Sequence, residues 1–336
     1  MTGRIACFGE LLLRLSAPER ELLLQSPRLE VYAGGAEANV AVALARLGHE
    51  AAMISRVPDN ALGDAAAGHL RRYGVSTGHV TTGPGRMGLY FLSPGAGLRA
   101  SDIVYDRDGS AFALAEAGDY DWDGLLDGAD MLHLSGITPA LGDGPAEAAL
   151  AAAAAARAKG VTISFDGNYR ESLWRRRQIE PRTVLGPLVG EADIFFGNHR
   201  DISLLLGRPF DGDGPARRRE AAEAAFTAFP RLALIASTAR HVVDADRHRI
   251  AARIDARDGA TQTEEVTVAG IVDRIGSGDA FAAGVLHGIR LGRDREWSVH
   301  AGLALACLKH SLPGDASLFG PADIEAFMAG ERDVRR

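Results

Sequence analysis

Short apolar runs alternate with helix-length segments from about residue 131 onward. The runs are residues 131–134, 161–165, 194–196 and 232–235, and polar or glycine residues follow each within two positions. Strands that are buried on both faces have this length and composition, whereas most helices are longer. The pattern predicts an α/β fold whose central, mainly parallel sheet is covered by helices on both faces.

Polar side chains follow these predicted strands at their carboxyl ends. Asp166 and Asn168 come after the second run, and Asn198 comes after the third. In open α/β sheets, ligands bind outside the carboxyl ends of the strands, so these loops are expected to converge on one crevice. Asp166, Asn168 and Arg170 also alternate, so in an extended segment they would face the same side.

Residues 10–33 and 86–114 show a different pattern. They contain strand-like runs such as residues 88–92 and 103–105, glycine-containing turns and no convincing helix. Such segments can form a small sheet that covers the crevice as a lid and excludes water from a transfer reaction. An edge extension of the main sheet is the alternative that the pattern leaves open.

The strongest chemical signal is the segment 273–279, which reads DRIGSGD and lies between a strand-like run and a helical pattern. Gly276, Ser277 and Gly278 would bring the N–H groups of a helix start close to a ligand. That arrangement suits the spread negative charge of a transferred γ-phosphoryl group. Asp279 could accept the proton of an attacking hydroxyl as the catalytic base. The alternative is a helix N-cap after a glycine turn, which is a common structural feature.

A second glycine motif lies near the N-terminus, at the start of a predicted helix that ends near Gly48. Gly34 and Gly35 would let backbone amides approach the hydroxyls of a polyol, and Asn39 could supply both a donor and an acceptor. A glycine-rich helix start without a ligand is the alternative.

The two motifs together resemble the signatures of the ribokinase family, also called the PfkB carbohydrate kinases, and the resemblance spans essentially the whole chain. It implies a ribokinase-like three-layer α/β sandwich with a small β-sheet lid. The expected organisation is a single kinase domain over residues 1–336, with lid segments at about 10–33 and 86–114. The resemblance also implies Mg·ATP as the phosphoryl donor, Asp279 as the base and residues 276–279 as the anion hole.

Within that family the chain is most similar to 2-keto-3-deoxygluconate kinases. The similarity rests on Gly34 and Gly35 and on residues 88–90 (GLY), 105–107 (YDR), 134–139 (LSGITP), 166–170 (DGNYR) and 308–315 (LKHSLPGD). By this resemblance Tyr90, Tyr105, Arg107, Asn168 and Arg170 contact the substrate. The carboxylate of a sugar acid suits bidentate binding by a guanidinium group. For Arg107 and Arg170 the alternative is a surface ion pair.

The nucleotide site is expected at Asn198, Ser237, Gly276 and Gly278, but this part of the chain departs from the family pattern. Family members usually have a glycine-containing loop near residues 236–246, where this chain has no glycine. Asn198 is followed by Asp201 where a glutamate is more usual. Arg274, Ile275 and Ser277 also replace the residues that are common in the second motif.

Composition restricts the partners and the location. The 336 residues carry a formal net charge of −7, which argues against general binding to nucleic acid or anionic membranes. The arginine runs 175–177 and 217–219 are interpreted as solvated helix faces. Cys7 and Cys307 lie in apolar stretches and are typical of reduced core residues. No signal-peptide pattern at residues 1–15 and no membrane-length apolar run are found, so a cytoplasmic location is expected.

Two further sequence patterns are interpreted as having no functional role. Residues 83–88 match a dinucleotide fingerprint, but a strand-like segment follows them where that motif requires a helix. His241, His248 and His310 lack the spacing of metal ligands, so no protein residue is assigned to a metal.

Three hypotheses follow. The first is transfer of the ATP γ-phosphoryl group to a sugar-acid hydroxyl, with the 6-hydroxyl of 2-keto-3-deoxygluconate as the expected acceptor and Mg2+ as cofactor. The second is a kinase for a neutral sugar such as fructose, ribose or tagatose. The third is a non-catalytic sugar sensor on the same fold. A K+ requirement and a homo-oligomer joined through the lid are family expectations that the sequence does not decide.

Overall fold

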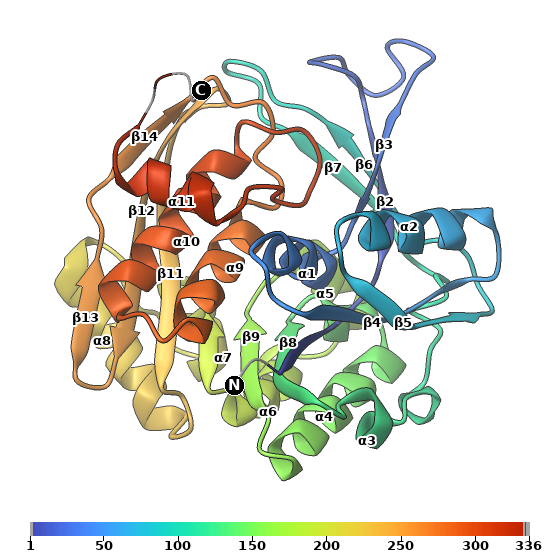
Figure 1. Ribbon diagram of the computed structural model, residues 1–336, viewed down its shortest axis with the longest axis horizontal. Coiled ribbons are helices and arrows are strands. Elements are labelled where there is room, and N and C mark those ends of the chain that lie inside the picture. Colours follow the sequence, from blue (N-terminus) through green and yellow to red (C-terminus); the bar gives the residue numbers. More distant parts are fainter. Residues whose placement is uncertain (1–2, 332, 334–336) are drawn as a thin grey trace.

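The computed structural model describes residues 3–331 and 333, and over these residues the chain forms a ten-stranded and a four-stranded sheet (Figure 1). The large sheet has the order β13-β12-β11-β10-β9-β8-β1-β4-β5, with β14 also paired to β12. Neighbouring strands from β5 to β11 are parallel, whereas β12 pairs antiparallel with β11, β13 and β14. The strands are β1 (Arg4–Phe8), β4 (Ala51–Pro58), β5 (Ser76–Gly83), β8 (Ala129–Ser135), β9 (Thr162–Asp166), β10 (Ile194–Phe196), β11 (Leu234–Asp244), β12 (Arg247–Ala256), β13 (Gly259–Gln262) and β14 (Val266–Ala269).

The large sheet separates two hydrophobic cores. Side chains of a strand alternate between its two faces, and in β1 Ile5 and Cys7 enter one core while Ala6 and Phe8 enter the other. The first core is completed by α1 (Ala36–Arg46), α2 (Ala61–Arg72), α9 (Ser277–Arg290), α10 (Arg295–Lys309) and α11 (Pro321–Met328). The second core is completed by α3 (Trp122–Leu125), α4 (Asp143–Ala158), α5 (Glu171–Arg177), α6 (Arg182–Glu191), α7 (His199–Leu206) and α8 (Gly214–Ala228). Two short 3-10 helices, Ala117–Asp119 and Thr138–Leu141, lie in the connections. The predicted three-layer α/β sandwich is therefore confirmed.

The small sheet contains β2 (Leu12–Ser16), β3 (Glu30–Gly34), β6 (Leu89–Ser93) and β7 (Asp102–Asp106), in the order β3-β2-β6-β7. These strands fall in the two segments that the sequence singled out, except that β3 extends to Gly34. The small sheet is separate from the large one, so the alternative of an edge extension is wrong. One side packs Leu12 and Tyr90 against Tyr105, whereas Val31 and Val104 are exposed.

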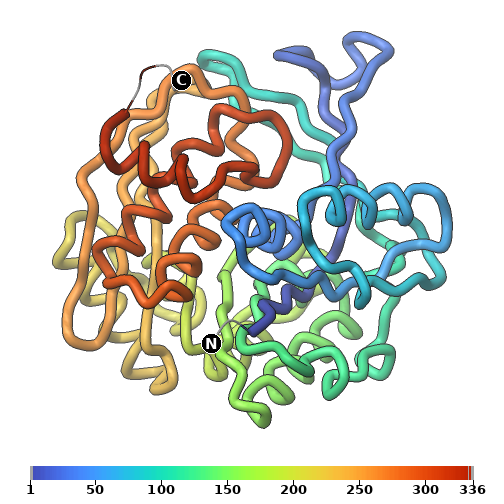
Figure 2. The backbone as a smooth tube through the Cα atoms, viewed as in Figure 1, coloured from blue at the N-terminus to red at the C-terminus, as the bar shows by residue number. Residues whose placement is uncertain are grey.

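Helices from the N-terminal and C-terminal parts of the chain pack together in the first core. Figure 2 shows the blue N-terminal segment beside the orange and red C-terminal helices, and α1 contacts α9. This packing brings the two glycine motifs, which are far apart in sequence, to the same place. Cys7 and Cys307 are both buried in this core, as predicted. Within the described residues, no helix is both long and apolar enough to cross a membrane.

Two sequence interpretations need correction. The predicted strand 232–235 does not end before Ser237, because β11 continues to Asp244 and forms a long hairpin with β12. The arginines of α8 do not all lie on a solvated face, because Arg219 is half-buried and hydrogen-bonds to the backbone near β13. In α5, Arg175 and Arg176 are exposed as expected. Arg177 is not, because its side chain is only 9% exposed and donates to the backbone carbonyl of Pro139 and to Asp143.

Candidate active site

A cavity of about 850 Å³ lies at the carboxyl ends of the parallel strands, between the large and small sheets. The predicted residues that line it are Gly35, Asn39, Tyr90, Tyr105, Arg107, Asn168, Arg170, Asn198, Ser237, Gly276, Ser277, Gly278 and Asp279. Of the predicted residues within the described chain, Gly34 alone falls outside this lining; a Cβ added there would collide with the carboxylate of Asp315. The structure therefore brings nearly all of the predicted site residues together around one cavity.

The glycine turn before α9 requires glycine at one position and leaves open space at another. Gly276 has a φ of 76°, and an added Cβ would collide with the backbone carbonyl oxygen of Asp315. At Gly278 an added Cβ would meet no atom within 4 Å. The first turn of a helix has N–H groups without intrahelical partners, so the start of α9 presents donors and a partial positive charge to the cavity. This geometry fits a phosphate group.

Asp279 is the third residue of α9 and lies half-buried in the cavity wall. The amide nitrogen Nδ2 of Asn39 donates a 2.7 Å hydrogen bond to its Oδ2 atom. Burial raises the pKa of Asp279 to about 7, and this hydrogen bond together with the charge of Arg170 opposes the rise. A carboxyl group that titrates near neutral pH is well matched to accepting a proton from a hydroxyl.

Two further carboxyl groups lie in the same part of the cavity. Burial, with added repulsion from Asp279 and Asp201, raises the pKa of Asp166 to about 8. The pKa of Asp201 is also raised, chiefly by burial. For all three carboxyl groups burial is the largest cause of the raised pKa, and the charge of Arg170 opposes the rise. Among the described residues, no group of three or more His, Cys, Asp or Glu side chains is placed to hold a metal ion by itself. Mg2+ would therefore arrive with phosphate oxygens and take one or two of these carboxylates as ligands, as is usual in kinases.

The opposite part of the cavity is formed by the small sheet and the loops near it. Arg107 is buried, and its Nε atom donates to Glu10 Oε2 at 2.5 Å, while Ser110 donates to the other oxygen of Glu10. The alternative of a surface ion pair is therefore wrong for Arg107. The Tyr90 hydroxyl donates to Asp315 at 2.6 Å, and the Tyr90 and Tyr105 rings lie 6.2 Å apart.

The loop after β9 reaches the cavity, although not as an extended segment. Asn168 has a φ of 38°, in the left-handed region, so strict alternation does not hold after Asp166. The backbone N–H of Asn168 donates to Asp166 Oδ1 at 3.0 Å, which closes a tight local turn. Asp166, Asn168 and Arg170 nevertheless all line the cavity, and Arg170 is exposed there.

At the end of the cavity next to β11, Asn198 caps α7 by accepting a hydrogen bond from the backbone N–H of Arg200. Asp201 accepts a hydrogen bond from the backbone N–H of Asn198. Ser237 lines the cavity from β11, so the segment where a glycine loop is common in the family is here a strand. This explains the absence of glycine between residues 236 and 246, since a hairpin strand does not need it.

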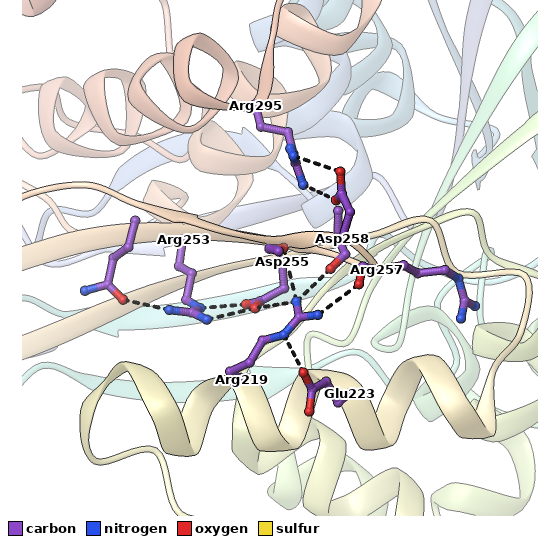
Figure 3. A network of polar contacts seen from close by, with 10 residues as sticks. Arg219, Glu223, Arg253, Asp255, Arg257, Asp258 and Arg295 are labelled. Atoms are coloured by element: carbon purple, nitrogen blue, oxygen red, sulfur yellow. Dashed lines mark hydrogen bonds and ion pairs between the residues drawn. The ribbon is translucent and has the colours of Figure 1, made fainter.

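Basic side chains from the β11–β12 hairpin complete this end. Arg253 is buried and donates to both oxygens of Asp255 over 2.6 and 2.8 Å, and Arg219 of α8 also reaches Asp255 (Figure 3). Arg253 and Arg240 line the cavity together with Arg274 of the glycine turn. These arginines make the end of the cavity suitable for an anion.

Comparisons with known proteins agree with this arrangement. The profile of the pfkB family carbohydrate kinases matches residues 2–319. The chain belongs to the pfkB family of carbohydrate kinases. Kinases of this family use ATP with Mg2+.

Several relatives of this PfkB kinase act on keto-deoxy sugar acids, according to their names. A 2-dehydro-3-deoxygalactonokinase from Haloferax volcanii is 33% identical over 331 residues, which is 98% of each chain. A 2-dehydro-3-deoxygluconokinase from Bacillus subtilis is 29% identical over 342 residues, covering 98% of this chain and 96% of the relative. The crystal structure of a 2-dehydro-3-deoxygluconokinase from Thermotoga maritima superposes with a TM-score of 0.93 at 36% identity, covering 98% of this chain and 100% of that one.

Sequence reasoning missed the ion-pair cluster behind the glycine turn of this PfkB kinase. Arg14 of β2 is buried and pairs with Asp273 at 2.6 Å and with Asp315 at 3.0 Å. Its guanidinium group also lies over the ring of Tyr32, 4.5 Å from the centroid. The cluster links the small sheet to the turn. Asp273 and Asp315 belonged to segments that carried the family resemblance, but nothing in the sequence pointed to Arg14.

Glu37 is a second residue that the sequence did not single out, although it lies inside the first glycine motif. It is fully buried, and the hydroxyls of Ser135 and Thr138 donate to its Oε1 atom at 2.7 and 3.0 Å. Burial raises its pKa, and the hydrogen bonds from Ser135 and Thr138 oppose the rise. Through these bonds Glu37 ties α1 to the end of β8 beside the cavity.

Proposed function

We propose that this PfkB kinase transfers the γ-phosphoryl group of Mg·ATP to the 6-hydroxyl group of 2-keto-3-deoxygluconate, also called 2-dehydro-3-deoxygluconate. The observation that carries the proposal is the layout of the cavity. A basic group, Arg107, lies at the small-sheet end and Asp279 lies at the glycine turn. A sugar acid bound between them would present its carboxylate to arginine and its far hydroxyl to the base. The names of the relatives support the same class of acceptor.

In the proposed reaction, Asp279 holds the acceptor hydroxyl and takes its proton. The hydroxyl oxygen forms a bond to the γ-phosphorus while the bond from that phosphorus to the bridging oxygen breaks, so ADP leaves. Backbone N–H groups of the turn at Gly276, Ser277 and Gly278 stabilise the charge on the transferred group. Asn39 orients Asp279 through their hydrogen bond. Asp166 and Asp201 are the carboxylates that would lie nearest to a Mg2+ ion arriving with the nucleotide, and that ion would offset phosphate charge.

The other proposed contacts follow from the positions of the lining residues. Arg107 and Arg170 would bind the carboxylate, with Tyr90, Tyr105, Asn168 and the backbone at Gly35 around the sugar. Asn198 and Ser237 would contact the nucleotide together with Gly276 and Gly278. The hairpin arginines Arg240 and Arg253 are further candidates for the nucleotide because they line the same end.

We propose that the chain acts as one kinase domain in which residues 10–33 and 86–114 form the lid. Leu12 and Ile103 of the small sheet line the cavity, so closure of this sheet over a substrate would exclude water.

The exposed Val31 and Val104 on this sheet support a homo-oligomer joined through the lid, which mass measurement in solution would test. The buried cysteines support a reducing, cytoplasmic location.

The second candidate acceptor is 2-keto-3-deoxygalactonate, the C4 epimer of 2-keto-3-deoxygluconate. The name of the Haloferax volcanii relative supports this candidate. A neutral sugar is a third, because Glu10 already neutralises Arg107 and could leave little charge for a carboxylate. The sensor hypothesis is disfavoured because the Asn39–Asp279 pair is kept at the glycine turn.

Acceptor preference tests the proposal. ADP release from Mg·ATP is measured with the two keto-deoxy acids, fructose, ribose and tagatose, and the product is located by phosphorus NMR. The proposal predicts the highest kcat/KM for 2-keto-3-deoxygluconate and a 6-phosphate product. In Arg107→Ala, KM should rise far more for the acid than for a neutral sugar, by about tenfold or more. A neutral sugar as best acceptor, or equal effects of the substitution on both classes, would contradict it.

A further inference from the structure

Lysine is rare in this chain, and one of the lysines is fully buried. Of the 37 lysine and arginine residues, only Lys159 and Lys309 are lysines. Lys159 lies at the end of α4 and pairs at the surface with Asp123 at 3.3 Å. Lys309 is the last residue of α10 and has no exposed surface. A buried ammonium group is costly, so its position invites a functional explanation.

The ammonium of Lys309 is held by backbone carbonyl groups. Its Nζ atom donates to the carbonyl oxygen of Leu312 at 3.0 Å and to that of Asp273 at 3.4 Å. No ion pair among residues 3–331 and 333 includes this ammonium. Burial lowers the pKa of Lys309, whereas the charges of Asp273, Asp315 and Asp279 favour its cationic form and Arg14 opposes it. Three acidic groups therefore face the ammonium at longer range than a salt bridge.

The two carbonyl groups belong to the two segments that build the glycine turn. Asp273 begins the turn, and Leu312 lies in the loop that continues to Asp315. The same segments are joined by hydrogen bonds from the backbone N–H groups of Val272 and Asp273 to the carbonyl of His310, at 2.8 and 3.2 Å. The Gly314 N–H also donates to Asp273 Oδ2 at 3.1 Å. Lys309 thus supplies positive charge where the two segments that form the turn are joined.

We propose that the ammonium of Lys309 is a built-in monovalent cation that positions the glycine turn 273–279 for phosphoryl transfer. The inference rests on the proposed function in that the turn is taken as the phosphate site. Carbonyl oxygens are the ligands that replace the hydration shell of K+ in proteins, and an ammonium ion fits such a site. Lysine offers a compact point charge with rotatable donors, whereas the planar guanidinium of arginine has a different shape. Lys309 is a positioning residue, and the chain carries its own cation, so added K+ is not required.

The test compares Lys309→Met, Lys309→Ala and the surface control Lys159→Met with the wild type. Kinetic constants for ATP and for the best acceptor are measured, with Tm as a check on folding. Lys309→Met should lose about tenfold or more in kcat while KM for the sugar changes by less than about threefold, because the turn acts on the transferred group. Lys159→Met should match the wild type. Lys309→Ala leaves space for a small cation, so ammonium chloride should restore kcat where tetramethylammonium chloride at equal ionic strength does not.

A wild-type measurement keeps the inference falsifiable if the Lys309 variants fail to fold. The inference predicts full wild-type activity in tetramethylammonium salts free of K+, Na+ and ammonium. Strong activation by K+, or a Lys309→Met kcat within twofold of wild type, would overturn it. These outcomes are independent of which sugar is the acceptor. Failure of the proposed function would instead appear as wild type that turns over no acceptor, or as Asp279→Asn that remains active.

Discussion

The side-chain amide of Asn39 donates a 2.7 Å hydrogen bond to the carboxylate of Asp279, a residue 240 positions further along the chain. Asn39 belongs to the first glycine motif and Asp279 to the second. The contact exists because α1 and α9 pack in the same core on one face of the large sheet. It joins the acceptor side of the cavity to the predicted base, and it affects the protonation of that base.

The Asn39 contact predicts a shift in the pH dependence of activity. The wild-type pKa of Asp279 is about 7, and the base acts only when deprotonated, so kcat/KM should rise with pH through that value. The Asn39 hydrogen bond lowers this pKa, so Asn39→Ala should move the acid limb to higher pH. The control is Asn60→Ala, since Asn60 caps α2 and lies outside the cavity lining. An unchanged acid limb in Asn39→Ala would count against Asp279 as the titrating group.

Asp166 predicts a pH dependence of stability. Its pKa is about 8 in the folded chain, against an ordinary value of about 3.9. A raised pKa favours the folded state below the ordinary value, and that contribution is lost as pH rises through the folded value. Asp166→Asn should therefore gain urea resistance relative to wild type as pH increases from about 4 to about 9. Parallel urea midpoints for the two proteins across this range would contradict the raised pKa.

Alanine substitutions at Gly276 and Gly278 are expected to have different effects on stability. Gly276→Ala introduces a collision with the carbonyl of Asp315 and an unfavourable positive φ, so both Tm and kcat should fall sharply. Gly278→Ala meets no protein atom within 4 Å, so Tm should stay close to wild type. If Gly278→Ala keeps its Tm yet raises KM for ATP, a ligand approaches this backbone closely. Equal thermal stability in both variants would show that the turn is not built as described.

Arg14 predicts coupling between the small sheet and the turn. Arg14→Met leaves the buried carboxylates of Asp273 and Asp315 without their guanidinium partner, a loss typical of about 3–5 kcal/mol for a broken buried pair. Tm and kcat should both decrease. Arg20→Met is the matched control, because Arg20 pairs with Asp246 at the surface and its loss should change little. Similar changes in Tm for the two substitutions would contradict the proposed coupling of the small sheet to the turn through Arg14.

Much of the fold was predictable because the hydrophobic pattern determines it. The runs that became β8, β9 and β10 are apolar, short and followed by polar residues, and these features suffice to predict a parallel sheet with its ligand crevice. The small sheet was also found, since glycine turns and strand-like runs occur there without a helical pattern. The length of β11 was not predictable, because the polar residues after Ile235 are as compatible with a loop as with a hairpin.

The candidate site was predictable where a motif carried it, and not where long-range packing created it. Asp279 and the glycines were identified from local sequence. The pairing of Arg14 with Asp273 and Asp315, and of Arg107 with Glu10, depends on segments far apart in the chain. An isolated arginine or lysine gives no sign in the sequence that it will be buried, and Lys309 is such a case.

The central claim is that Asp279 is the base of a kinase for 2-keto-3-deoxygluconate. It is tested most directly by ADP release from Mg·ATP with this acceptor, comparing wild type with Asp279→Asn. The account predicts strong wild-type turnover and a fall in kcat of about a hundredfold or more in the variant, with Tm retained. Wild type that releases no ADP with this sugar acid, or a variant with near-wild-type kcat, would contradict it.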